Sequence, residues 1–526
     1  MGTYQQEARR FREINMDILL SATKQFGDFG IDLTAGGNMM QRRADLNRVQ
    51  VTDFVVRGLY TVQNARVKNP TYGLSERAVN SLYGSAEFSY KGTLYLNGTL
   101  RNDWFSTLSP ENRSILYPSI SASYVFSESF KNSAKWLTFG KLRAAYAEVG
   151  SDTDVAPYSD VLFYSINANL FANPNGSLQP VGGSVGNTLP NPNLRPMRTA
   201  ETEVGLDVRM FENRLGIDLA VYQKITSDQI VSAQISDASG FVQTLINSGQ
   251  SRNRGVEFLV NIVPVKSSTF QWDIIFNASY NKTKVLSLLT EEPGERILVG
   301  SHVFNGFLYQ VVGEEMGQLA GFGYRRDEQG RQVFGDNGVP LRTEDIVLFG
   351  SALPKWMGGI TNAFTFKGIQ LSALIDFKLG NTMMSGTNFN ATRHGLHKMT
   401  LDGRDGGVIG EGVNINGEPN TVAAESQRYW EVVRSQQLVE PIVYDGGYWK
   451  LRQITAGYDF TKHLPGDFFV KSLALNFVAN NVLMLKKWVP NIDPETFGYS
   501  SDNLVGLEST GVPSTRGLGF NLNVKF

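Results

Sequence analysis

The residues best suited to chemistry in this chain are its histidines. His394 and His397 are three residues apart, a spacing that would suit two metal ligands on one face of a helix. No third ligand stands beside them, and His302 and His463 also fall outside the predicted strands. A catalytic site needs a nucleophile, a base and an orienting group that converge. The pattern therefore indicates solvated loop histidines, and it predicts no catalytic residue, no metal site and no enzyme.

An acidic, glycine-rich run is a second candidate, for a cation held by oxygen ligands. Asp402, Asp405 and Glu411 lie within residues 401–417. Carboxylates among glycines can hold calcium, but this spacing misses the EF-hand ligand pattern. A turn-rich external loop explains the run better. We therefore expect no cofactor, with calcium in this loop as the weaker alternative.

Composition excludes several further classes. The chain has 526 residues, 49 of them basic and 50 acidic, and it has no cysteine. The near balance of charge does not point to nucleic acid as a partner. The absence of cysteine rules out a disulfide framework and thiolate chemistry. No apolar run approaches the roughly 18–20 residues that a transmembrane helix needs.

The strongest pattern is an alternation of apolar and polar residues, which predicts strands with two unlike faces. In residues 199–211, Val204 and Leu206 alternate with Glu203 and Asp207. A charge that faces lipid at the midplane costs roughly 2–4 kcal/mol, so the charged face must line a lumen. A slip of one residue would expose all the charges together, and the register is therefore strongly specified.

This alternation recurs in fifteen predicted strands. They are residues 13–26, 29–41, 77–90, 93–106, 117–130, 137–150, 199–211, 215–232, 253–266, 270–286, 355–367, 369–384, 447–460, 472–485 and 514–526. Most pairs are joined by short turns, and the longest predicted loops are residues 42–76, 151–198, 289–354, 385–446 and 486–513. We expect these long loops to pack on one another.

Short turns at one end and long loops at the other are typical of membrane β-barrels. We therefore predict an all-β fold, an antiparallel transmembrane β-barrel with long extracellular loops and short periplasmic turns. An array of soluble β-sandwiches is the alternative. It is disfavoured because it would need turn signals every 8–12 residues or so and no strict alternation of short and long connections.

A barrel of this kind would bind a ligand near its external mouth and in the loops above it. Arg101 and Asp103 stand on the polar face at the outer end of one predicted strand, and Asp376 and Lys378 do so on another. Three aromatic residues could stack on a sugar ring or hold a peptide side chain. They are Trp430, Tyr444 and Trp449. In the alternative interpretation, the charges solvate the lumen or hold a plug, and the aromatic residues form the membrane belt.

Short motifs occur in a characteristic order along the whole chain. They are residues 80–86 (NSLYGSA), 101–104 (RNDW), 117–119 (YPS), 140–143 (GKLR), 149–152 (VGSD), 191–196 (NPNLRP), 203–207 (EVGLD), 253–257 (NRGVE), 448–452 (YWKLR) and 457–458 (GY). With these motifs the chain resembles the SusC/RagA family of TonB-dependent outer-membrane transporters. The resemblance covers the full length.

The resemblance implies a plugged barrel of about 22 strands, of which this chain carries about fifteen. We therefore expect residues 1–526 to be the C-terminal portion of the barrel, with no plug domain, TonB box or signal peptide. Fifteen strands would leave two unpaired edges in lipid. Either a separate chain then supplies the plug and leading strands, or this chain is a piece of a longer product.

The resemblance further implies TonB-energised import of a large nutrient, a glycan or an oligopeptide, across the outer membrane of a Gram-negative bacterium. The implied partners are TonB, a SusD-like lipoprotein lid and outer-membrane lipid, in a dimer of transporter–lid pairs. Two other functions stay open. A passive diffusion pore would need a closed, even-stranded barrel with a constricting loop, and a barrel fragment would have no function.

Overall fold

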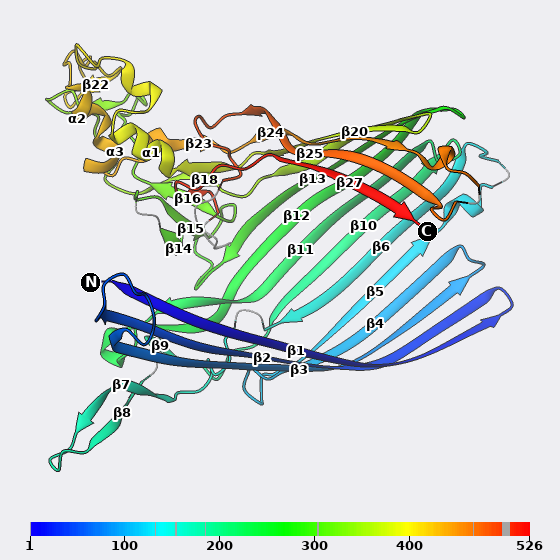
Figure 1. Ribbon diagram of the computed structural model, residues 1–526, viewed down its shortest axis with the longest axis horizontal. Coiled ribbons are helices and arrows are strands. Elements are labelled where there is room, and N and C mark those ends of the chain that lie inside the picture. The colour runs from blue at the N-terminus through cyan, green and yellow to red at the C-terminus, as the bar shows by residue number, and fades with distance from the viewer. Residues whose placement is uncertain are drawn as a thin grey trace. The chain divides into compact units, whose positions relative to one another are not determined.

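The computed structural model describes residues 2–131, 133–152, 155–184, 186–301, 304–466, 468–496 and 505–526. Its main element is a 16-stranded sheet with the order β1-β2-β3-β4-β5-β6-β10-β11-β12-β13-β19-β20-β24-β25-β27, and β9 pairs with β12 off this path (Figure 1). The strands along the path correspond one to one to those predicted, which confirms the all-β, barrel-type fold. Among the described residues, no helix is long and apolar enough to cross a membrane.

The strands on this path are β1 (Thr3–Phe26), β2 (Phe29–Phe54), β3 (Ala65–Tyr90), β4 (Leu94–Phe105), β5 (Ser114–Tyr124), β6 (Leu137–Ser151), β10 (Met197–Met210), β11 (Leu215–Gln234), β12 (Gln243–Lys266), β13 (Phe270–Ser287), β19 (Trp356–Phe366), β20 (Ile369–Leu379), β24 (Tyr448–Asp459), β25 (Ser472–Lys487) and β27 (Gly517–Lys525).

The connections carry shorter elements. The strands among them are β7 (Tyr164–Ala172), β8 (Leu178–Ser184), β9 (Thr188–Leu189), β14 (Arg296–Ser301), β15 (Phe307–Val311), β16 (Gln318–Gly321), β17 (Val333–Phe334), β18 (Val347–Ser351), β21 (Thr382–Ser385), β22 (Val413–Asn414), β23 (Val443–Asp445) and β26 (Leu507–Glu508). The helices are α1 (Gly386–Arg393), α2 (Ser426–Trp430), α3 (Val432–Ser435), η1 (Phe126–Glu128), η2 (Asp237–Ser239), η3 (Lys398–Leu401), η4 (Glu440–Ile442) and η5 (Thr461–His463).

The chain divides into two compact units. The first comprises Met1–Val125, Arg143–Glu203 and Lys224–Gln250. The second comprises Phe126–Leu142, Val204–Gln223 and Ser251–Phe526. Most unit boundaries fall inside strands of the main sheet, so each unit contains part of the wall together with loops that follow its strands.

The first unit corrects one prediction, because residues 42–76 do not form a long loop. Strand β2 continues to Phe54 and β3 begins at Ala65, so only residues 55–64 connect them. Cross-strand ion pairs join the extended strands: Arg48 Nε lies 2.8 Å from Glu7 Oε2, and Arg43 Nη1 lies 2.9 Å from Glu76 Oε1. Opposite charges on facing strands stabilise pairing even where neither face is apolar.

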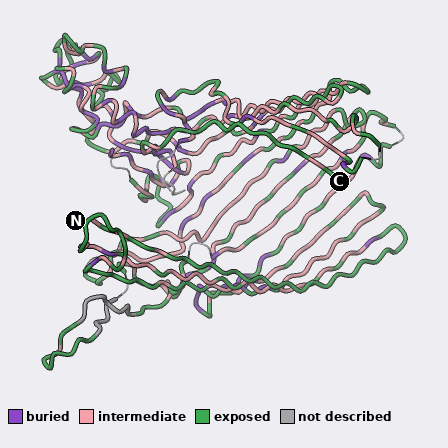
Figure 2. The backbone as a smooth tube through the Cα atoms, viewed as in Figure 1, coloured by how far each residue is buried: buried purple, intermediate pink, exposed green. Residues whose placement is uncertain are grey.

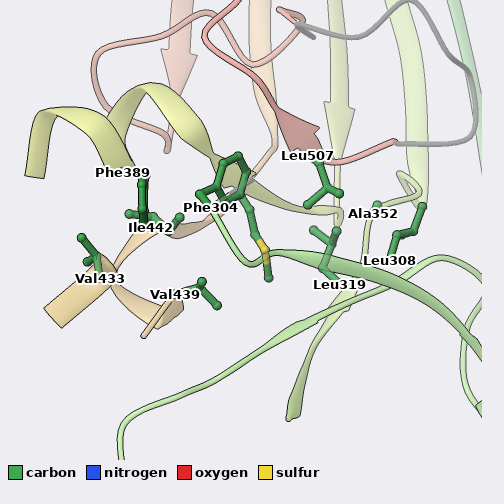
Figure 3. Close-up of a cluster of buried hydrophobic side chains, with 10 residues drawn as sticks. Phe304, Leu308, Leu319, Ala352, Phe389, Val433, Val439, Ile442 and Leu507 are labelled. Carbon is green, nitrogen blue, oxygen red and sulfur yellow. The ribbon is translucent and has the colours of Figure 1, made fainter. Parts of the chain in front are cut away.

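The second unit contains a folded lobe made of loop segments. We call the described residues 304–351, 382–445 and 505–508 the loop lobe. Buried residues gather there, whereas buried positions are sparse along the wall strands (Figure 2). Leu319, Phe389 and Leu507 come from three different predicted loops and share one hydrophobic core (Figure 3). The prediction that the long loops pack on one another is therefore confirmed for these three.

A second core stabilises another part of the loop lobe. Its buried residues are Phe334, Val339, Ala424, Tyr429, Val432 and Leu438. The Phe334 and Tyr429 rings stack with their centroids 6.5 Å apart. Burying each of several such side chains contributes roughly 1.5–3 kcal/mol, and these segments therefore fold instead of staying irregular.

Candidate functional site

Five charged residues meet in the second unit, where β24 faces β20 and the segment after β25. Lys450 Nζ lies 3.0 Å from Asp493 Oδ2 and 2.8 Å from Glu495 Oε2. Arg452 Nη2 lies 2.6 Å from Asp376 Oδ2 and 2.7 Å from Glu495 Oε1. We call these residues the Lys450 cluster. Two cations and three carboxylates form one continuous network in it.

The local backbone explains how β24 places two cations in this network. Alternation along the strand puts Lys450 and Arg452 on the same face, and Lys450 pairs with Asp376 across the sheet. The register then shifts, so that Gln453 pairs with Leu374 and Arg452 is the extra residue. A β-bulge of this kind re-aims side chains. Here it leaves both Arg452 and Gln453 on the polar face.

Lys450 is the buried centre of the network, and Glu495 receives several hydrogen-bond donors. The side chain of Lys450 is 3% exposed. The Tyr448 hydroxyl donates to Glu495 Oε1 at 2.7 Å. Burial alone would raise the pKa of Glu495, but hydrogen bonds from Arg452, Lys450 and Tyr448 outweigh it and lower the pKa to about 2. The Lys450 cluster therefore clamps residues 488–496, which we call the clamped segment, to the wall.

We expect the clamped segment to stay attached at neutral pH and to come loose in strong acid. Glu495 has a pKa of about 2 in the folded protein against an ordinary value of 4.5. Its stabilisation is therefore complete above a pH of about 4.5, declines below that, and is lost below about 2. The measurement is the rate of pepsin cleavage within the clamped segment at a series of acidic pH values, normalised to an unstructured peptide of the same sequence.

Glu495→Gln is the control for this prediction, because it removes the titrating group at constant size. In this variant, the rise in the normalised cleavage rate below a pH of about 4.5 should be absent. A normalised cleavage rate in the unsubstituted protein that does not change between a pH of about 5 and about 2 would contradict the prediction.

The first unit contains the other predicted charged pair, and the structure brings its members together. Arg101 Nε lies 2.8 Å from Asp103 Oδ1. Arg101 Nη2 donates to Ser81 Oγ at 2.9 Å, and the Tyr117 hydroxyl donates to Asp103. Asp103 is only 5% exposed. These groups satisfy one another on the polar face of β4, so they stabilise the wall whatever else they contact.

A neighbouring buried ion pair was missed by sequence reasoning. Arg77 pairs with Asp152, which is fully buried, and Thr107 Oγ1 donates to the same carboxylate at 2.5 Å. The pair anchors the start of a predicted loop to β3. Asp152 ends one of the motifs quoted for the family resemblance, but its partners Thr107 and Arg77 lie 45 and 75 residues away in sequence, and only the fold identifies them.

Asp376 and Lys378 are not an ion pair. Both lie on the polar face of β20, but Asp376 accepts from Arg452, and Lys378 has no ion-pair partner among the described residues. Trp449 lies on the opposite face of β24 from Lys450 and stacks on Phe377, with the centroids 4.5 Å apart. That position places Trp449 on the apolar face of the wall, away from the Lys450 cluster.

The two remaining aromatic candidates pack inside the loop lobe. Trp430 contacts Tyr429 edge to face, with the centroids 4.9 Å apart. Tyr444 packs against two hydrophobic cores, and burial raises its pKa to about 12. The indole N–H of Trp430 and the hydroxyl of Tyr444 are buried without a partner among the described residues. A role for any of these candidates in substrate binding stays a prediction.

The structure adds a polar pocket in the loop lobe that sequence reasoning did not identify. It has a volume of about 580 Å³, and its lining includes Tyr324, Arg326, Arg331 and Glu411. Arg326 Nη2 lies 2.6 Å from Glu440 Oε1, which orients one guanidinium at its edge. A pocket with tyrosine, arginine and carboxylate groups can hydrogen-bond sugar hydroxyls or peptide groups.

The described histidines have structural contacts. His394 Nε2 accepts from Arg393 Nε at 3.0 Å, and His397 Nδ1 accepts from the backbone N–H of Met399 at 3.1 Å. His302 lies outside the described residues. Within the described ranges, no three or more histidine, aspartate or glutamate residues gather in a way that could hold a metal ion.

The sequence that forms this wall and its loops matches a known protein family. The family described as "TonB dependent receptor-like, beta-barrel" matches residues 2–482. The chain belongs to this family. A similar relative, TonB-dependent receptor P3 of Formosa agariphila, is 24% identical over 489 residues, which cover 87% of this chain and 46% of the relative.

The resemblance to the SusC/RagA group is confirmed. TonB-dependent receptor SusC of Bacteroides thetaiotaomicron is 24% identical over 285 residues, covering 53% of this chain and 27% of SusC. The structure of the RagAB peptide transporter matches with a TM-score of 0.75 at 16% identity, covering 99% of this chain and 56% of that one. This chain spans about half the length of the curated relatives that it matches over most of its sequence.

Membership in this family settles the general class of the protein. TonB-dependent receptors are outer-membrane transport proteins and not enzymes. Family membership therefore confirms the prediction that this protein is not an enzyme. The polar faces that carry the Lys450 cluster and the Arg101–Asp103 pair are then the lumen faces of the wall.

Proposed function

We propose that this chain forms most of the wall of a TonB-energised importer for a large nutrient, a glycan or an oligopeptide. The observation that carries the proposal is the family match over residues 2–482 on a sheet whose loops fold into a packed lobe. The charged groups of the lumen faces are largely paired with one another, which suits a wall that guides cargo and does no chemistry on it. The RagAB structure, a peptide transporter, supports the oligopeptide as one cargo class.

We propose that a SusD-like lipoprotein lid closes the external mouth of the barrel. The exposed surface of the loop lobe supports this proposal. The lobe exposes several large apolar side chains. They are Leu396 (80% exposed), Leu401 (54%), Ile409 (59%), Ile415 (57%) and Val422 (41%). We propose that these side chains contribute to the surface that contacts this partner. We propose the dimer of transporter–lid pairs on the family resemblance alone.

The edges of the main sheet support a further proposal about completion of the barrel. Strands β1 and β27 end the sheet order, so each pairs on one side only. An unpaired strand edge in lipid leaves backbone groups without partners, at a cost of several kcal/mol for each group. We propose that additional strands, from a longer form of the protein or from a second chain, pair along these two edges, and that the same source supplies a plug for the lumen.

Uptake in the native host tests the proposed function. Deleting the gene should abolish uptake of a labelled oligopeptide mixture or a labelled oligosaccharide mixture, and a protonophore should abolish the same uptake, because TonB depends on the proton gradient. The class of label that is lost identifies the cargo. Uptake that depends on the gene but resists the protonophore would contradict energised import and favour a passive pore.

Copurification provides the matching control. The intact protein should be recovered from the outer membrane together with a lipoprotein lid and with the plug, on the same chain or on another. Recovery of the 58.2 kDa chain alone, folded and heat-modifiable, would overturn the importer. A chain that never reaches the membrane would indicate a fragment without function.

A further inference from the structure

The outer face of β1 changes from apolar to basic, and the neighbouring strands add one arginine and two carboxylates at the same level, Arg43, Asp45 and Glu76. Along β1, Ile14, Met16, Ile18 and Leu20 share the face opposite to the polar residues, and they are 36–74% exposed. The next residue outward on this face is Arg12. Register places Arg12 directly beside Arg43 of β2, and the three strands lie side by side here (Figure 1).

The spacing of charges along β1 matches the thickness of a membrane. On the apolar face, the charged residue beyond the other end of the stripe is Lys24, and eleven residues lie between Arg12 and Lys24. A transmembrane β-strand needs about 9–11 residues. Arg12 and Lys24 therefore mark the two headgroup levels, and Arg12 belongs to the end that carries the long loops.

Two of the arginines at this level have unused hydrogen-bonding capacity. Arg43 is committed, because its Nε and Nη2 contact Asp45 at 3.0 Å each and its Nη1 contacts Glu76. Arg10 and Arg12 have no hydrogen bond or ion pair among the described residues, and Arg10 lies opposite Asp45 in the register of β1 and β2. Arg12 faces Arg43 directly in the register of β1 and β2. Because Arg43 already contacts two carboxylates, Arg12 is the cation of this pair that lacks an anionic partner among the described residues.

The same residues line two adjoining hollows. One has a volume of about 700 Å³, and its lining includes the cations Arg10, Arg12 and Arg43 together with Asp45, whose carboxylate is held by Arg43. The other has about 390 Å³, shares Arg12 and Arg43, and reaches Ile14 at the edge of the apolar stripe. A ligand that fits both would need an anionic group beside the arginines and an apolar part along the strands below.

We propose that Arg10 and Arg12, with Arg43 beside them, bind the phosphate-bearing headgroup of a lipid of the outer leaflet. Guanidinium groups bind phosphate in bidentate fashion, and paired arginines provide two such contacts. The acyl chains would lie along Ile14, Met16 and Ile18. A free phosphate ion would use only the arginines and leave the apolar stripe uncovered, so the apolar residues beside the arginines favour a lipid. The inference rests on the proposed outer-membrane location and not on import.

The test counts lipid molecules that remain on the protein. The protein with its complete barrel is extracted from the native outer membrane in mild detergent, and bound phosphorylated lipid is measured by native mass spectrometry. The double variant Arg10→Gln, Arg12→Gln should retain about tenfold less of this lipid, because each charge-assisted contact with phosphate is lost. Equal retention by the double variant and the unsubstituted protein would overturn the proposal.

Lys24→Gln is the matched control, because it removes one positive charge from the same strand and face at the other headgroup level. It should leave retention of the outer-leaflet lipid unchanged, and an equal loss in this variant would indicate a general charge effect and overturn the site. Added inorganic phosphate should not displace the lipid; full displacement would show a free anion site instead. Outer-membrane fractionation and heat modifiability of all variants test the proposed location separately.

Discussion

Lys450→Met should release the clamped segment from the wall. The substitution keeps the length of the side chain but leaves Asp493 and Glu495 without the buried cation that lies 3.0 and 2.8 Å from them. Removing one partner from a buried ion pair costs about 3–5 kcal/mol. Here Asp493 loses its cation, while Glu495 keeps Arg452, so we expect a cost at the lower end of this range. Amide hydrogen exchange of residues 488–496 should therefore become much faster, while exchange in β1 and β2 should not change.

Lys462→Met is the control, since Lys462 lies exposed at η5 and its loss removes the same charge. Its effect should stay within about 0.5 kcal/mol. Adding Asp493→Asn and Glu495→Gln to Lys450→Met should restore part of the protection, because no buried charge is then left unpaired. Unchanged exchange in Lys450→Met alone would show that the cluster does not hold the segment.

Glu508→Ala should unfold part of the loop lobe. Glu508 is fully buried. Its Oε2 accepts from Ser385 Oγ at 2.8 Å and from the backbone N–H of Thr387 at 2.9 Å, and its Oε1 accepts from Thr387 Oγ1 at 2.8 Å. Hydrogen bonds to a charged group contribute roughly 1.5–3 kcal/mol each, so we expect a loss of at least about 3 kcal/mol.

The loss should be local, because Glu508 joins β26 to the start of α1, where Ser385 caps the helix. Limited proteolysis should give new cleavage sites in the loop lobe, while the wall stays heat-modifiable. Glu508→Gln should have a smaller effect, since its amide keeps one oxygen acceptor. Glu425→Ala is the matched control: Glu425 precedes α2 but makes no capping hydrogen bond. Equal cleavage in Glu508→Ala and Glu425→Ala would refute the prediction.

The wall strands could be predicted from sequence because their two faces differ. Where the two faces of a strand are alike, the sequence did not predict the strand. The outer parts of β2 and β3 carry polar residues on both faces, and their pairing depends on contacts such as Arg48 with Glu7. Alternation cannot reveal such contacts before the partner strand is known. The same limit applies to Glu508, whose donors lie more than a hundred residues away in sequence.

The candidate site was predicted in part. The polar-face positions of Arg101, Asp103 and Asp376 followed from alternation, but the partners of Asp376 and Lys450 did not, because Arg452 reaches the cluster through a bulge and Glu495 through a folded loop. Trp449 is different. Trp449 and Lys450 are consecutive residues of one strand. Alternation alone therefore predicts that Trp449 lies on the face opposite to Lys450.

The unbroken ladder between β1 and β2 has a consequence for the order in which the wall assembles. These strands pair residue for residue from Phe26 with Phe29 to Thr3 with Thr52, and the turn between them has two residues. Contacts that are close in sequence cost little loop-closure entropy, so this hairpin can form early and lengthen from its turn. Strands β13 and β19 must wait for the intervening residues 288–355. The part of the wall that carries the loop lobe should therefore close last, and its strand edges are the ones that a periplasmic chaperone would need to protect.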